Sequence, residues 1–208
     1  TVGNLAAEIA NKIGANSLLV RTGALYHDIG KMEDPVFFTE NQAGVNPHDN
    51  MSYIESARVV MRHVTEGVRM AEKANLPAFI RDFILTHHGR GVTKYFYIKY
   101  KNEHPDINVD VTQFQYPGPN PFTREQAILM IADGVEAASR SLAEYTEESI
   151  SELVNRFAGM IPGMEDFFQT KFITTLKDYD PYAHIGTYSR DVLILQGSAD
   201  ILVPVSSS

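Results

Sequence analysis

Residues 24–31 read ALYHDIGK, and this stretch organises the interpretation of the whole chain. Apolar residues at helical spacing, including Leu18 and Leu25, lead up to His27 and Asp28. These two adjacent residues are therefore expected at the C-terminal end of a helix. That end carries the negative pole of the helix dipole, which favours a cation. The stretch therefore predicts a pair of metal-capable side chains where a helix stops.

A second pair, His87 and His88, shows the same arrangement. It is followed by Gly89 at the expected end of a helix that begins at Pro77. Taken alone, a His–His pair is more often an accident of surface composition than a metal site. However, this pair also lies at the C-terminal end of a predicted helix, as His27 and Asp28 do.

Two single residues complete a candidate ligand set. His63 lies in the middle of a predicted helix, and Asp133 follows the apolar run 127–132, where a carboxylate is costly unless it is paired or bound to metal. Each residue has an ordinary structural explanation by itself. The full order favours a nitrogen and oxygen metal site suited to Mn, Fe or another transition metal, with these ligands: His27, Asp28, His63, His87, His88 and Asp133.

Composition limits the other possibilities. The chain has 208 residues, 18 Lys+Arg against 26 Asp+Glu, and a net charge of −8, which argues against binding a nucleic acid polymer. The absence of cysteine excludes disulfides, thiolate metal sites and a Cys nucleophile. No apolar run approaches the roughly 20 residues of a membrane span, and no signal peptide is visible.

The periodicity predicts an all-α helical bundle. Loops are expected at 33–51 and 102–122, and capping boxes open two helices at Ser52–Glu55 and Thr123–Gln126. We expect a domain at 1–190 and a strand-like tail at 191–208 whose origin the pattern does not explain. The helices are expected at 4–14, 16–30, from 52, 77–89, 95–100, from 123, 147–158 and 164–177.

The ligand order and several loop motifs together resemble the HD-domain metal-dependent phosphohydrolases. The likeness is specific to the cytoplasmic domain of the seven-transmembrane HD phosphodiesterases and covers about residues 2–180. The motifs that carry it are ALYHDIGKMEDPVFFTENQ, NPHDNMS, FILTHHG, VTKYFY, YPGPNP and ILMIADGVEAASRSL. The related cyclic di-GMP enzymes have a GYP motif after the His pair, which is replaced here by RGVTKYFY.

The resemblance implies an HD-domain bundle that hydrolyses cyclic di-AMP to linear pApA with a hydroxide activated by two metals. His27 and Asp28 match the His–Asp signature of the family, in which Asp28 would bridge the two ions. His63, His87 and His88 would bind the second metal, and Asp133 would close the site. The family has one more metal-binding His just upstream of the motif that reads TVGNLA here, and the chain is expected to be part of a longer protein.

Three further residues are predicted to contact substrate. Lys31 could be a solvated helix-end cation, but beside the metals we favour a contact with the substrate phosphate and a catalytic role. His48 in the NPHDN loop and Arg90 after the His pair are predicted substrate-side residues. The aromatic residues 95–97 could stack on adenine, although such a stripe more often belongs to a core.

The resulting hypothesis is a cyclic di-AMP phosphodiesterase, with a cyclic dinucleotide as its small-molecule partner and two Mn or Fe ions as cofactors. The parent protein would be anchored in the membrane with this domain on the cytoplasmic face, and an oligomer is compatible with it. Two alternatives stay open. One is an HD phosphohydrolase of another nucleotide, and the other is a catalytically impaired sensor that binds nucleotide with at most one metal.

Overall fold

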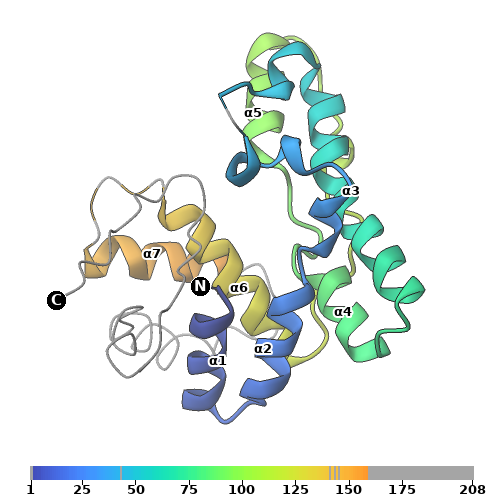
Figure 1. The fold of residues 1–208 in the computed structure, drawn as a ribbon. Coiled ribbons are helices and arrows are strands. Elements are labelled where there is room, and N and C mark those ends of the chain that lie inside the picture. The colour runs from blue at the N-terminus through green and yellow to red at the C-terminus, as the bar shows by residue number, and fades with distance from the viewer. Residues whose placement is uncertain (1, 43, 141, 143, 145, 159–208) are drawn as a thin grey trace, which may run out of the picture.

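The computed structural model describes residues 2–158 except 43, 141, 143 and 145 (Figure 1). Over these residues the secondary structure is helical, and the only β pairing described is an isolated bridge between Val92 and Gln115. The predicted all-α class is therefore confirmed. The predicted helix at 164–177 and the strand-like tail at 191–208 lie outside the described residues.

The α-helices match the predicted order. They are α1 (Val2–Ile13), α2 (Ser17–Tyr26), α3 (Tyr53–Lys73), α4 (Ala78–Thr86), α5 (Lys94–Glu103), α6 (Arg124–Ser139) and α7 (Glu147–Ala158). A short 3-10 turn, η1 (Ile29–Met32), follows α2. The two predicted loops contain four more: η2 (Pro35–Phe37), η3 (Thr39–Asn41), η4 (Pro47–Asn50) and η5 (Val111–Phe114).

The core forms where α1, α2 and α6 pack together, in the lower part of Figure 1. Helix α6 is apolar around most of its circumference, and its residues 127–132 are all buried. A helix that is apolar all round is stable only inside a protein, which explains its central position. Asp133 is thereby placed at the rim of the core. No helix within the described part of the chain is long and apolar enough to cross a membrane.

Both predicted capping boxes are present. The Ser52 side chain accepts a hydrogen bond from the Glu55 backbone N–H while the Glu55 carboxylate accepts one from the Ser52 backbone N–H, and Thr123 and Gln126 do the same for α6. Each box satisfies two backbone donors that the helix itself leaves free. Helices α3 and α6, which carry His63 and Asp133, thus begin at positions set by local sequence.

Helix α2 ends earlier than predicted. It stops at Tyr26, whereas the sequence suggested continuation to Gly30, and Asp28 has a non-helical φ of −104° and ψ of 10°. The reason is tertiary. The backbone at Gly30 lies directly against α3, where a Cβ atom would overlap the carbonyl oxygen of His63. Turning the chain at Asp28 allows this contact and brings the carboxylate toward α3.

Helix α4 likewise stops before the predicted Gly89. Its last residue is Thr86, and His87 is the C-cap, donating its backbone N–H to the carbonyl of Phe83. Gly89 has a φ of +51°, in the left-handed region that glycine tolerates best. The chain therefore leaves the helix between the two histidines.

Candidate metal centre

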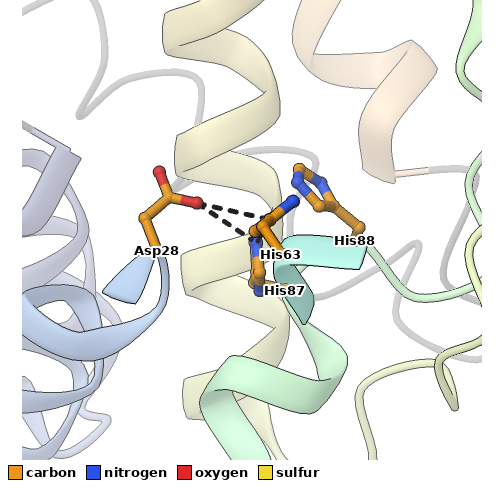
Figure 2. A group of neighbouring side chains, drawn as sticks. All are labelled: Asp28, His63, His87 and His88. Atoms are coloured by element: carbon orange, nitrogen blue, oxygen red, sulfur yellow. Dashed lines mark hydrogen bonds and ion pairs between the residues drawn. The ribbon is translucent and has the colours of Figure 1, made fainter. Parts of the chain in front are cut away.

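Three elements bring four of the predicted ligands together. Asp28 comes from the turn between α2 and η1, His63 from the middle of α3, and His87 and His88 from the end of α4 (Figure 2). One ligand atom from each residue lies within 4.8 Å of all the others. Asp28 Oδ1 is 3.4 Å from His63 Nε2 and 3.6 Å from His87 Nε2. This spacing could hold a metal ion.

Hydrogen bonds to the backbone fix the tautomers of two of these rings. His63 Nδ1 lies 2.6 Å from the Val60 carbonyl oxygen, and His87 Nδ1 lies 2.7 Å from the Ile84 carbonyl oxygen. A carbonyl can only accept, so each Nδ1 carries the hydrogen and each neutral ring presents a lone pair at Nε2. The same outer hydrogen bonds orient histidines in metal sites.

The two free lone pairs of His63 and His87 face each other, with the Nε2 atoms 3.1 Å apart. Neutral rings in these tautomers have no hydrogen to place between them, so only a proton or another cation satisfies both. Burial, and then the nearby His87, lower the pKa of His63 to about 4 against the opposing pull of Asp28. Burial also lowers the pKa of His88. Because protonation is disfavoured, the donor set fits a metal ion.

His27 and Asp133 lie on the other side of the Asp28 carboxylate. His27 Nε2 is 3.3 Å from Asp28 Oδ2 and 3.5 Å from Asp133 Oδ1. His27 Nδ1 faces the Ala24 carbonyl oxygen at 2.8 Å, so Nε2 again points inward. That atom is buried without a well-formed hydrogen bond. Asp28 therefore stands between two groups of donors, one at each oxygen.

The charge balance of this second side differs from that of the first. Burial opposes protonation of His27, but the nearby carboxylates of Asp133 and Asp28 outweigh it and raise the pKa of His27 to about 10. The pKa of Asp28 lies well below its usual range despite burial, because His27, His87 and Lys31 stabilise the carboxylate. An excess of carboxylate around one imidazole attracts any available cation.

Lys31 lies at the edge of the same carboxylate. Its Nζ is 2.8 Å from Asp28 Oδ2 and 2.8 Å from Glu40 Oε1, and it sits 5.1 Å from the centre of the Phe38 ring. Burial works against the charged ammonium, but the two carboxylates outweigh it and raise the pKa of Lys31. The structure therefore places a positive charge beside the cluster.

Three residues near the cluster were not identified from the sequence. The Tyr116 ring stacks on His88 with centroids 4.2 Å apart, and the buried Phe38 ring meets His63 edge-on at 5.7 Å. Glu40 is the second partner of Lys31. All three lie in motifs that carry the resemblance, but no spacing rule links a loop residue to a ligand on another helix.

Two predicted substrate residues have described contacts outside the His–Asp cluster. His48 Nε2 donates a hydrogen bond to the Phe37 carbonyl oxygen at 3.0 Å, and its ring contacts Phe37 and Phe96. The Arg90 side chain is exposed, while its backbone N–H donates to Asn120 Oδ1. Their roles toward substrate remain predictions.

The aromatic stripe at 95–97 is only partly a core element, which corrects the sequence interpretation. Tyr95 is 64% exposed. Phe96 and Tyr97 are half-buried, and Tyr97 packs against Phe114 at 5.7 Å. Helix α5 lies on the surface of the upper part of Figure 1, so only one of its faces can pack inward.

The fold and the cluster together define an all-α domain with a site that could hold a metal ion. Comparison with known proteins agrees, because residues 1–138 match the family model described as HD domain. The chain belongs to the HD domain family.

Two similar proteins are the cyclic-di-AMP phosphodiesterases PgpH of Listeria monocytogenes and of Bacillus subtilis. The first is 45% identical over 155 residues and the second 41% identical over 154 residues. Each match covers 74% of this chain and 21% of the relative, so the chain spans about a fifth of their length. A solved structure of the L. monocytogenes PgpH HD domain in complex with cyclic-di-AMP is 40% identical, with a TM-score of 0.75. It covers 85% of this chain and 87% of that one.

Proposed function

We propose that this chain is the catalytic domain of a metal-dependent phosphodiesterase that hydrolyses cyclic di-AMP to linear pApA. The observation that carries the proposal is the likeness to an HD domain solved with cyclic-di-AMP bound, at 40% identity over most of both chains. The convergence of the four ligands in Figure 2 supports the same conclusion.

The proposed cofactor is a pair of divalent transition metals, with Mn and Fe favoured by the nitrogen and oxygen donors. His63, His87 and His88 would hold one ion near Asp28 Oδ1, and His27 and Asp133 would hold the other near Oδ2. The orientation of three Nε2 atoms by backbone carbonyls supports this assignment. When bound, such a pair supplies a water nucleophile at neutral pH and neutralises phosphodiester charge.

In this reaction water adds to one phosphorus and the bond from that phosphorus to a 3′-oxygen breaks. The product carries a 5′-phosphate at one end and a 3′-hydroxyl at the other. The two oxygens of Asp28 connect the two groups of ligands. The ammonium of Lys31 pairs with a non-bridging phosphate oxygen. The charge on Lys31 is worth more here than in bulk water because the side chain is largely buried.

We also propose that the domain lies on the cytoplasmic face of a membrane-anchored protein. The relatives are about five times longer than the part that matches, which leaves room for anchoring and sensing segments. Cell fractionation with protease protection of the natural full-length protein tests this proposal. Cleavage of the domain only after the membrane is opened supports the cytoplasmic side.

The activity is tested by incubating the natural full-length protein, loaded with Mn²⁺, with cyclic di-AMP and separating the products. We expect pApA from the wild type and from Asp106→Ala, an exposed loop control. Asp28→Ala is expected to form no product. Turnover of cyclic di-GMP or an alarmone, without turnover of cyclic di-AMP, would overturn the substrate. Tight nucleotide binding with one ion per chain and no turnover would favour a sensor.

A further inference from the structure

Lys31 and a second metal ion would compete for the same carboxylate oxygen. Lys31 Nζ lies 2.8 Å from Asp28 Oδ2, and this is the oxygen that faces His27 at 3.3 Å. An ammonium and a divalent cation at the same oxygen repel one another, and pairing with Lys31 takes up one of the two lone pairs of Oδ2 and part of its negative charge. The ammonium therefore needs another partner when the His27 side is loaded.

Glu40 provides that partner. Its Oε1 lies 2.8 Å from Lys31 Nζ, the same distance as Asp28 Oδ2. We infer that Glu40 is a positioning residue that draws the Lys31 ammonium away from Asp28 and thereby keeps Oδ2 available to a metal ion on the His27–Asp133 side. The inference rests on the proposed two-metal function and assigns a residue that controls how the second position fills.

The loop that carries Glu40 is anchored to the cluster. Phe38, one residue before η3, is 7% exposed and contacts both the His63 ring and the Lys31 ammonium. A cation beside an aromatic face is stabilised there by the ring quadrupole. The ammonium can therefore move toward Glu40 while keeping contact with Phe38, so it stays beside the substrate position.

The test is a Mn²⁺ titration of the metal-free, natural full-length protein, followed by calorimetry and elemental analysis. In Glu40→Gln we expect the second equivalent of Mn²⁺ to bind about 10-fold to 100-fold more weakly, the usual effect of losing a residue that supports a metal ligand, and the first to be unchanged. Glu33→Gln is the matched control, because Glu33 lies at the start of the same loop and pairs with Arg69 at 3.5 Å. It is expected to titrate like the wild type.

A double-mutant cycle separates this role from simple loss of negative charge. If Glu40 acts through Lys31, Glu40→Gln has little effect on the second equivalent in a Lys31→Met background. An equal loss in both backgrounds, or wild-type titration of Glu40→Gln, would overturn the inference while leaving the proposed activity intact. A wild type that binds a single Mn²⁺ would overturn both the two-metal proposal and this inference, even if the protein turns over cyclic di-AMP.

Discussion

The two sides of the Asp28 carboxylate are built from different chemistry. The imidazole side contains His63, His87 and His88, and burial lowers the pKa of His63 and of His88. The carboxylate side pairs His27 with Asp133 and lies next to Lys31, and its imidazole holds a proton strongly. The contrast teaches that the imidazole side is organised for a cation before any metal binds, whereas the carboxylate side must release competing positive charge.

The largest expected effect comes from removing the residue common to both sides. Asp28→Ala should lose both ions and lower turnover of cyclic di-AMP by more than about 10³-fold, because a pre-organised charge at the reaction centre is lost. Circular dichroism should show the helical content retained. If the variant unfolds, Asp28 is structural and the contrast between two sides of one carboxylate fails.

One-sided substitutions should separate the two positions. His63→Ala removes a ligand from the imidazole side and Asp133→Asn weakens the carboxylate side, so each should bind close to one Mn²⁺ per chain. Electron paramagnetic resonance should lose the signal of a coupled Mn pair in both variants. Loss of both ions from Asp133→Asn, with Glu136→Gln on the same helix as control, would mean that the sides do not fill independently.

A methyl group at Gly30 should disturb both sides together. Its Cβ would overlap the His63 carbonyl oxygen, so Gly30→Ala must push the turn that carries Asp28 away from α3. We expect a loss of about 1–3 kcal/mol in the free energy of unfolding, as for other overpacked sites, and weaker binding of both ions.

Gly3→Ala is the control for this effect, because its Cβ would meet the Ala24 Cβ at a much less severe 3.3 Å. Denaturant melts of the two variants give the comparison. Equal stabilities would show that the close approach of Gly30 to α3 does not hold the carboxylate in place.

The smallest effect concerns the start of α3, which supports the imidazole side. Hydrogen bonds from the Ser52 hydroxyl and backbone N–H lower the pKa of Glu55 below its ordinary 4.5. A carboxylate with a lowered folded pKa adds stability above the unfolded pKa and loses it as the pH falls through the folded value.

Glu55→Gln should therefore melt slightly below the wild type at pH 7, and the gap should close at acid pH. Binding of Mn²⁺ at pH 7 should not change, because His63 lies well inside the helix. Glu148→Gln, at an exposed position of α7, is the control. A gap that persists at low pH would mean that the glutamate stabilises α3 without its charge.

Local sequence was enough to predict the order of the described α-helices and the capping boxes that open α3 and α6. Ser52–Glu55 and Thr123–Gln126 act over three residues, so no distant contact can change their outcome greatly. The early end of α2 was missed because its cause lies on α3, at the backbone beside His63. The position of Glu40 beside Lys31 was missed for a similar reason. A loop has no periodicity, so its sequence does not indicate which of its side chains will contact a distant residue.

The amino-acid order alone determined which residues have ligand chemistry, because imidazoles and carboxylates next to helix ends and core faces are unusual enough to stand out. Tertiary structure decided which of these residues lie beside each oxygen of Asp28. His27 and Asp133 are brought to 3.5 Å by the packing of α2 against α6, and the two oxygens of Asp28 acquire different neighbours only when α3 and α4 close around the turn. Directions in space between distant residues depend on packing, which no local pattern encodes.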